Sequence, residues 1–259
     1  MNDIRAIFLD FDGTVFSHVT DSIPLSTIES VRTLRNNGIR VFLCTGRAVA
    51  EMPAFDLSDL PLDAWILSNG QVILDENGKI VHDRKIEGIL KDRILSLFNE
   101  KSIPMYMITI DDIYLNMVNQ KVLDVQNAVS SGIPRIKEYE GEDIYMASAF
   151  FSSEAEKERL RDFEDLAEIT WWHEGAVDIV PKGISKINGI DEILKRYQID
   201  RSQTMAIGDG HNDISMIEYC ALGIAMGNSM RELKEHADYV TDDIDEDGVY
   251  NAFVHYGLF

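Results

Sequence analysis

The sequence predicts an α/β protein with a doubly wound parallel-sheet core and an inserted α+β domain. An apolar run near the N-terminus ends on two aspartates and a glycine, as a buried parallel strand does at its carboxyl end. Strand-like and helix-like segments then alternate, and the alternation resumes after residue 180. Between about 84 and 180 the order of elements changes. We therefore expect a core domain over 1–83 and 181–259 and an inserted cap domain over 84–180.

The first part of the core reads as strand, helix, strand, strand and hairpin. The apolar run ending at Asp10 predicts the first strand, and Ser26-Thr27-Ile28-Glu29 predicts a capping box at the start of a helix that Gly38 ends. Further strands are expected over 39–44 and near 64–67. Two alternating strands over 71–83 surround Asn77-Gly78, a strong hairpin signal.

The predicted insertion contains segments with helical periodicity and segments with strand periodicity. We expect helices over 89–98, 118–129 and 155–163, and strands over 105–108, 113–117, 144–151, 169–172 and 177–180. The core then continues with a helix over 185–197, strands over 205–207 and 222–226, and a C-terminal helix. The acidic run over 242–247 is expected to be a solvated loop and helix start.

Composition excludes several classes of function. The chain has 259 residues, of which 45% are hydrophobic and 27% charged, and its formal net charge is −21. Nucleic acids and anionic membrane surfaces would be repelled, whereas a small anion bridged by a metal would not. Cys44 and Cys220 show neither disulfide nor zinc spacing, and no run reaches the roughly 18 apolar residues of a membrane span. We expect a cytoplasmic protein without an obligate protein partner.

Asp10 and Asp12 are the first candidate functional residues. Residues i and i+2 of an extended segment point to the same side, and the carboxyl edge of a parallel sheet is where ligands bind. Two carboxylates about 4 Å apart repel by roughly 4 kcal/mol at an effective dielectric of 20, so the pair requires a cation or a shared proton. A simple turn is the alternative. An EF-hand is excluded, because Val15 stands where its glycine would be and a strand precedes the loop.

Other predicted strand ends carry polar groups as well. The second strand ends at Thr45-Gly46-Arg47, the third at Ser68-Asn69-Gly70, and the strand over 205–207 is followed by Asp209, Asn212 and Asp213. Four aspartates would give this edge a formal charge of −4, which predicts Mg²⁺, whose preferred ligands are carboxylate, phosphate and water oxygens. A cation must also face a bound phosphoryl group. Lys182 and Lys186 are the candidates, and Lys186 is favoured.

These residues resemble four motifs of the haloacid dehalogenase superfamily, specifically the Cof-like sugar-phosphate phosphatases with a large cap after the second motif. The motifs stand in order as Asp10-Phe11-Asp12-Gly13-Thr14, Thr45-Gly46-Arg47, Lys182-Gly183-Ile184-Ser185-Lys186 and Gly208-Asp209-Gly210-His211-Asn212-Asp213. The resemblance covers nearly the whole chain, although the cap matches only in layout. It implies the Rossmann-like core of that superfamily and a phosphoryl-transfer activity.

The resemblance also implies a role for each motif. Asp10 is expected to be the nucleophile that becomes an aspartyl-phosphate, and Asp12 the general acid and then base. The expected phosphate-binding residues are Phe11, Thr45, Gly46, Lys186 and Asn212. The expected Mg²⁺-binding residues are Asp10, Asp12 through its backbone carbonyl, Asp209 and Asp213.

Several assignments leave an alternative open. Thr45 could merely satisfy backbone groups at a strand end, and Lys182 could replace Lys186. Asp213 could orient Asp209 and waters, or act as an anion at a helix start, without touching the metal. Arg47 fits a substrate contact and a structural salt bridge equally well, and His211 fits an exposed loop residue without a role.

Substrate selectivity is expected to come from the cap. Trp172, His173 and Asp178 are the candidate substrate contacts there, beside Arg47 from the core. An aromatic face could stack on a sugar, but an alternating strand would bury at least one of Trp171 and Trp172 as core.

The sequence thus predicts a Mg²⁺-dependent phosphatase for small phosphorylated metabolites, hexose phosphates first. A phosphomutase or other phosphotransferase of the same fold is the nearest alternative, and a non-catalytic sugar-phosphate sensor is the second.

Overall fold

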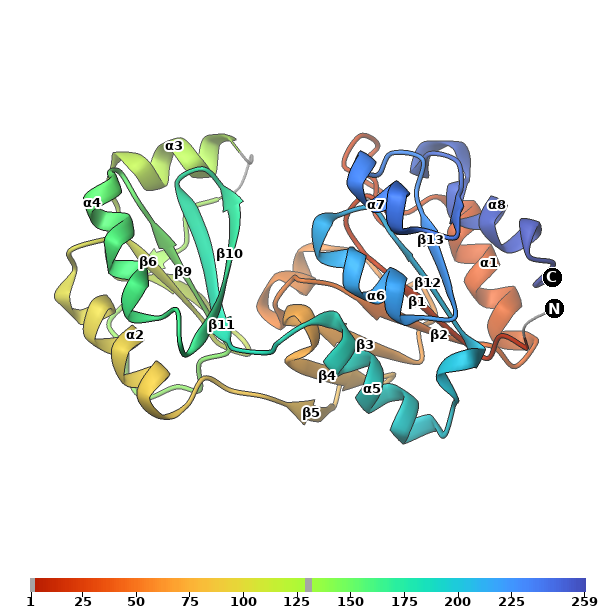
Figure 1. Ribbon diagram of the computed structural model, residues 1–259, viewed down its shortest axis with the longest axis horizontal. Coiled ribbons are helices and arrows are strands. Elements are labelled where there is room, and N and C mark those ends of the chain that lie inside the picture. The colour runs from red at the N-terminus through yellow and green to blue at the C-terminus, as the bar shows by residue number, and fades with distance from the viewer. Residues whose placement is uncertain (1–2, 129–131) are drawn as a thin grey trace. The chain divides into compact units, whose positions relative to one another are not determined.

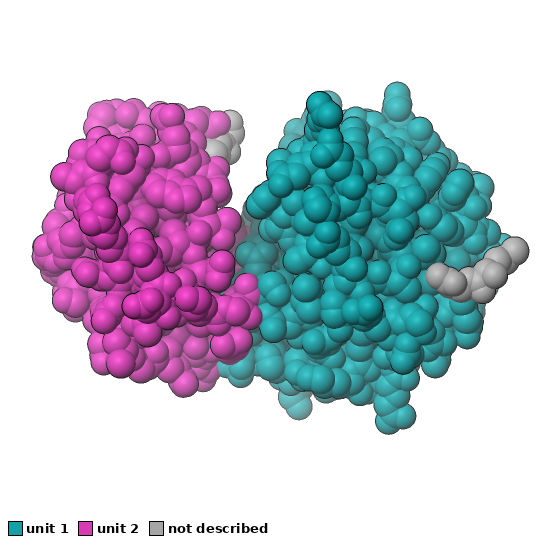
Figure 2. All heavy atoms as spheres, in the orientation of Figure 1, with its two compact units in different colours: residues 1–47, 54–83, 185–259 teal, residues 48–53, 84–184 magenta. Residues whose placement is uncertain are grey.

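The computed structural model describes residues 3–128 and 132–259, which fall into two compact units (Figure 2). The core unit comprises Met1–Arg47, Ala54–Asp83 and Ser185–Phe259, and the cap unit comprises Ala48–Pro53 and Arg84–Ile184. The expected insertion over 84–180 lies in the cap unit. That unit also holds 181–184 and the short segment 48–53, both of which were expected in the core domain.

An eight-stranded sheet forms the centre of the core unit, in the order β14-β13-β12-β1-β2-β3-β4-β5 (Figure 1). Strands β14 to β3 pair in parallel, and β4 and β5 add an antiparallel hairpin. The strands are β1 (Ala6–Leu9), β2 (Arg40–Cys44), β3 (Ala64–Leu67), β4 (Val72–Asp75), β5 (Ile80–Asp83), β12 (Thr204–Gly208), β13 (Leu222–Ala225) and β14 (Tyr239–Val240). The predicted α/β fold class is confirmed.

Five α-helices lie in the described part of the core unit. They are α1 (Leu25–Asn36), α5 (Lys186–Tyr197), α6 (Ile214–Tyr219), α7 (Arg231–His236) and α8 (Gly248–His255). Side chains of α5, α6 and α7 pack with Phe8, Phe42 and Ala206 on one face of the sheet. The intervening residues, such as Ile7 and Leu43, are also fully buried, as expected for a parallel sheet with both faces covered.

The predicted capping box at Ser26 is wrong. Helix α1 begins two residues earlier than a Ser26 cap would place it, with Pro24 at the N-cap and no side-chain cap. The Ser26 hydroxyl instead donates to Asp247 at the start of α8, 2.6 Å away. A local sequence pattern could not reveal this partner, which is 221 residues distant.

The cap unit is built on a six-stranded sheet in the order β10-β11-β9-β6-β7-β8. Its strands are β6 (Met105–Ile108), β7 (Ile113–Leu115), β8 (Arg135–Ile136), β9 (Met146–Phe150), β10 (Ala167–His173) and β11 (Ala176–Pro181), and its α-helices are α2 (Gly88–Glu100), α3 (Gln120–Ala128) and α4 (Glu154–Lys157). Ile94 and Phe98 of α2 pack with Met107 on one face of the sheet. Val122 and Val125 of α3 pack with the alternate residues on the other face.

Some predicted elements differ in extent or were missed. The helix expected over 118–129 is α3, and Val129 lies outside the described residues. The helix expected over 155–163 is a single α-helical turn, α4, followed by the 3-10 helix η3 (Glu158–Asp162). The short elements α6, α7, β8 and β14 were not predicted. Within the described ranges, no helix has the length and apolar character needed to cross a bilayer.

Asp63 fastens the start of β2 to the end of α1. Its buried carboxylate accepts four hydrogen bonds, two from Arg35, one from Arg40 and one from the Val41 amide. We expect Asp63→Ala to lower the free energy of unfolding by about 2 kcal/mol, because the variant leaves these donors unpaired. The urea-unfolding midpoint measures this. Asp59→Ala is the matched control, since Asp59 is 81% exposed beside Arg32, and a change there as large as that of Asp63→Ala would contradict the argument.

Candidate active site

The polar groups that follow the core strands meet at one edge of the sheet. Strand β1 lies between β12 and β2, with all three parallel and in register, so their carboxyl ends are neighbours. Asp10 follows β1, Thr45 follows β2 and Asp209 follows β12. The sheet therefore brings together three motifs that are distant in sequence.

Lys186 occupies the centre of this edge. It is the first residue of α5, only 1% exposed, and its ammonium donates to Asp10 Oδ1 at 2.5 Å and to Asp213 Oδ1. Helix α5 is positioned by the capping box of Ser185 and Asn188. Lys182, the alternative lysine, lies in the cap unit, where its ammonium donates to the Glu164 carbonyl at 3.4 Å.

Asp209 completes a group of acids around Asp10. Oxygens of Asp10, Asp209 and Asp213 all lie within 4.8 Å of one another. Gly13 makes room for this approach, because a Cβ at that position would lie 2.3 Å from Asp209 Oδ2 and the backbone φ of +77° is strained for other residues. The Thr14 hydroxyl donates to Asp209 Oδ1 at 3.3 Å.

The three carboxylates of Asp10, Asp209 and Asp213 face only one nearby cation, Lys186, within the described residues. Burial, and then repulsion by Asp213, raises the pKa of Asp10 well above its usual range, although Lys186 opposes the shift. The same two causes raise the pKa of Asp209 to about 6. Burial would lower the pKa of Lys186, but the carboxylates of Asp10 and Asp213 outweigh it and raise that pKa. A set of oxygen donors with excess negative charge fits a divalent cation such as Mg²⁺.

Asp213 is largely saturated by protein donors. Its Oδ1 accepts from Lys186, and its Oδ2 accepts from the amides of Asp209 and Gly210 at 3.0 and 2.8 Å. These bonds fix the loop that carries Asp209. Both oxygens of Asp213 therefore already accept hydrogen bonds from protein groups, and its role toward the metal stays a prediction.

Asp12 is held by two basic residues of the core unit. Arg47 Nε and Nη2 donate to its two oxygens, each at 2.7 Å, and His18 Nε2 lies 2.6 Å from Oδ1. Burial would raise the pKa of Asp12, but hydrogen bonds from Arg47 and His18 hold it below its usual value. Arg47 thus lies at the carboxyl edge of the core sheet, hydrogen-bonded to a predicted catalytic residue.

Small polar groups lie at the ends of β2 and β3. The Thr45 hydroxyl accepts from the Arg47 amide at 3.1 Å, which leaves its own proton available to a ligand. Asn212 Nδ2 is 3.5 Å from Asn69 Oδ1, and a Cβ on Gly46 would touch both side chains. Phe11, by contrast, has a fully buried side chain, so any phosphate contact would come from its backbone.

The sequence did not single out three neighbours of the site. Thr14 was named only as the last residue of the first motif, and His18 was not named. Both lie in the loop after β1, and each contacts a predicted acid. Asn69 was noted only as part of a strand end, and its left-handed backbone, with φ of +53°, turns it toward Asn212. His211 is exposed, with Glu232 3.5 Å away, as expected for a loop residue.

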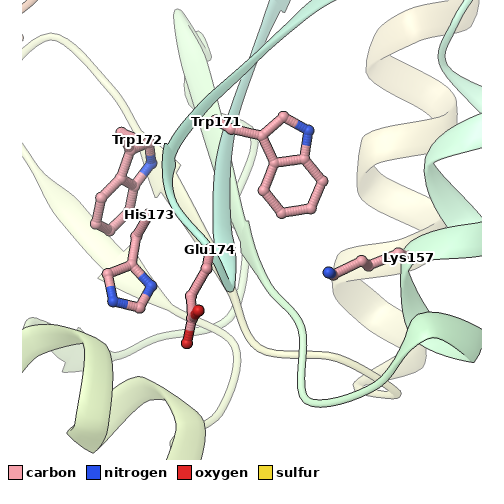
Figure 3. A pocket seen from close by; sticks show the side chains of 5 residues that line it. All are labelled: Lys157, Trp171, Trp172, His173 and Glu174. Atoms are coloured by element: carbon pink, nitrogen blue, oxygen red, sulfur yellow. The ribbon is translucent and has the colours of Figure 1, made fainter.

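The cap tryptophans contradict the expectation that at least one is core. Trp171 is 46% and Trp172 is 37% exposed, because β10 is the edge strand of the cap sheet. Trp171 lies beside Lys157 on one side of the strand, and Trp172 and His173 lie on the other (Figure 3). These residues and Glu174 line a surface pocket of about 500 Å³.

Asp178 supports Trp172 from the neighbouring strand. Its Oδ1 accepts from Trp172 Nε1 at 3.0 Å and from the Ser148 hydroxyl at 2.6 Å. Burial raises the pKa of Asp178 to about 6, although both hydrogen bonds oppose the shift. The three side chains form a connected polar group on the cap sheet.

The raised pKa of Asp178 gives a pH-dependent effect on stability. In the folded state Asp178 keeps its proton up to about pH 6, whereas an unfolded aspartate loses it near pH 4, so stability falls as the pH rises through this window. Asp178→Asn cannot ionise. We expect its stability relative to wild type to rise by about 1 kcal/mol between pH 5 and pH 8, at 1.36 kcal/mol per pKa unit. Urea unfolding at several pH values measures this, and a constant difference would contradict it.

Comparison with known proteins gives consistent matches over the whole chain. The family model of haloacid dehalogenase-like hydrolases matches residues 7–253. The chain is 34% identical over 259 residues to YkrA of Bacillus subtilis (strain 168), covering 99% of both proteins. It is 28% identical over 258 residues to the 5-amino-6-(5-phospho-D-ribitylamino)uracil phosphatase YcsE of the same organism, covering 99% of this chain and 97% of YcsE. The solved structure of BT4131, a sugar phosphatase of subclass IIB, superimposes with a TM-score of 0.83 at 32% identity, covering 98% and 100% of the two chains.

Proposed function

The chain belongs to the haloacid dehalogenase-like hydrolases and is a phosphatase of the Cof-like group, and we propose that it is a Mg²⁺-dependent enzyme for small polyhydroxylated phosphate esters, hexose phosphates first. The observation that supports this most strongly is the buried Lys186 between Asp10 and Asp213, with Asp209 completing the acidic group. Two relatives support the substrate class. BT4131 is a sugar phosphatase, and the YcsE substrate is a phosphorylated ribityl compound.

The first half of the reaction phosphorylates the enzyme. Asp10, at the end of β1, attacks phosphorus, so that one Asp10 oxygen bonds to phosphorus and the bond between phosphorus and the alcohol oxygen breaks. Asp12 is ionised in the resting enzyme because its pKa is lowered, so it must take up a proton when the substrate binds, and it then gives that proton to the departing oxygen. Lys186 neutralises the attacking group, and Thr45, the Gly46 amide and Asn212 hold the phosphoryl oxygens.

The second half releases phosphate. Water attacks the aspartyl-phosphate while Asp12 accepts the proton of that water, and the bond between phosphorus and the Asp10 oxygen breaks. Asp10, Asp209 and the backbone carbonyl of Asp12 would hold Mg²⁺, with Asp213 orienting Asp209. When bound, the ion neutralises negative charge that builds up on the phosphoryl group.

The cap residues supply the selectivity in this proposal. Trp172 offers an aromatic face, and Asp178 fixes its indole through the Nε1 hydrogen bond. His173 lies next to it on β10, with Nδ1 accepting from the Gly175 amide at 3.1 Å. An aromatic face beside polar groups suits a sugar, which has both apolar C–H faces and hydroxyl groups.

A panel of phosphate esters tests this function. Hexose, pentose, ribityl, pyridoxal and p-nitrophenyl phosphates are assayed with Mg²⁺, with chelator, and after Mg²⁺ is restored. We expect phosphate release that the chelator abolishes and Mg²⁺ restores, with hexose phosphates turned over fastest. Equal rates across the panel would contradict the hexose preference, and no release from any ester would contradict hydrolysis.

The same panel separates the alternatives. A phosphomutase would need a bisphosphate and would transfer the phosphoryl group to a second hydroxyl instead of releasing it. A sensor would bind sugar phosphate without release, and binding would be unchanged in Asp10→Asn. The presence of both Asp10 and Asp12 argues against a sensor, which would require neither a nucleophile nor a general acid.

A further inference from the structure

The carboxylate of Asp12 has only part of its surface open to a reaction partner. A carboxylate has about four lone-pair positions on its two oxygens. Arg47 Nη2 and His18 Nε2 both lie at Oδ1, at 2.7 and 2.6 Å, whereas among residues 3–128 and 132–259 Oδ2 has the single donor Arg47 Nε at 2.7 Å. Oδ2 therefore keeps a free lone-pair position, whereas both lone-pair positions of Oδ1 already accept hydrogen bonds.

Arg47 is itself fixed by aromatic rings. Its guanidinium carbon lies 4.5 Å from the ring centre of Phe55 and 5.9 Å from that of Phe11. Phe11, Phe16 and Phe55 contact one another with ring centres 4.9 to 5.4 Å apart. A planar guanidinium on such a support can present two parallel N–H groups in one orientation, which a lysine cannot do.

We propose that Arg47, assisted by His18, is the positioning residue of Asp12, and that the two residues reserve Asp12 Oδ2 as the atom that exchanges the proton with the leaving group and with water. This inference rests on the proposed phosphatase function. It gives Arg47 a role that acts through Asp12, in place of the direct substrate contact that the sequence left open. No bond to phosphorus involves Arg47, and the proton passes between Asp12 Oδ2 and the substrate or water oxygen.

The choice of leaving group separates this role from other roles of Arg47. A hexose alkoxide leaves slowly without a proton, whereas p-nitrophenolate is stable as an anion and leaves without one. General acid catalysis contributes about 100-fold or more where it is needed. In single-turnover experiments with enzyme in excess, we expect Arg47→Met to slow phosphoenzyme formation from a hexose phosphate by about 100-fold. We expect the same step with p-nitrophenyl phosphate to slow by less than about 3-fold, since it gains little from the proton.

A double-mutant cycle tests whether Arg47 acts through Asp12. The loss in Asp12→Asn/Arg47→Met should be close to that in Asp12→Asn alone, because two residues that act as a unit have non-additive effects. Arg47→Lys should keep part of the rate, since one of the two parallel donors is lost. Arg32→Met is the control, because Arg32 lies at the surface beside the exposed Asp59, and its rates should match wild type.

The outcomes distinguish this inference from the proposed function. Multiplicative losses in the cycle, or equal losses with both substrates, would show that Arg47 contacts the substrate directly or supports the fold, and would overturn the inference alone. A wild-type enzyme that releases phosphate from no ester would overturn the proposed function and the inference with it.

Discussion

Asp10→Asn is expected to lower kcat for phosphate-ester hydrolysis by at least about 10,000-fold. The amide keeps the size of the side chain but cannot form the acyl-phosphate bond. Lys186 donates to Asp10 Oδ1, and an asparagine oxygen can still accept that bond, so the site should keep its geometry. Steady-state phosphate release measures the loss.

The same variant should leave the fold intact. Asp10 is a buried acid repelled by Asp213 and Asp209, so removing its charge is expected to leave the unfolding midpoint equal to that of wild type or above it. Acid quenching during turnover should trap a phosphoryl group on a peptide containing Asp10 in wild type and none in the variant. A variant that stays active, or a phosphoryl group on another residue, would contradict the assignment of Asp10 as nucleophile.

Lys186→Met is expected to lower kcat by about 100- to 1,000-fold and also to destabilise the protein. The variant removes the cation that donates to Asp10 and Asp213, both of them buried. Breaking a buried ion pair by removing one partner costs about 3 kcal/mol or more, because the other charge stays buried. Activity assays and urea unfolding without Mg²⁺ measure the two effects.

Mg²⁺ should partly compensate for the lost lysine. A ligand that binds only the folded state stabilises it, and a site with more uncompensated negative charge should bind Mg²⁺ more tightly. We therefore expect Mg²⁺ to raise the unfolding midpoint of Lys186→Met more than that of wild type. Lys182→Met is the matched control, from the same motif but bonded to the Glu164 carbonyl in the cap unit. If Lys182→Met lost activity and Lys186→Met did not, the two lysines would have to exchange roles.

The parts of the fold that the sequence predicted are those with long, continuous signals. Strands β1, β2 and β12 are apolar runs that end in polar motifs, and each motif is at the carboxyl edge where it was expected. Strand β8 has two residues and helix α7 has six, too few for a periodic pattern. The exposure of other side chains depends on tertiary contacts. The tryptophans of β10 are half exposed because the strand is at a sheet edge, which no local pattern reveals.

The residues that gather at this sheet edge were predictable as a list, but the hydrogen-bonded pairs among them were not. The sequence placed Asp12 and Arg47 at neighbouring strand ends, yet their two-point hydrogen bond joins positions 35 residues apart and depends on the register of β1 with β2. His18 joins the same carboxylate from a loop without any repeating pattern. The saturation of Asp213 by two amides likewise depends on the backbone of one short loop.

The segment 48–53 limits the exchange of the cap unit as an independent domain. It directly follows Arg47 in sequence, but Ala48 is buried in the apolar cluster of the cap unit with Tyr106 and Phe150. The polypeptide therefore passes between the units at four peptide bonds rather than the two that a simple insertion would need. In a chimera that exchanges only 84–184 for the cap of a relative, the original segment 48–53 would have to pack against the new cap domain. Transferring substrate preference between relatives should therefore require exchanging segment 48–53 together with 84–184.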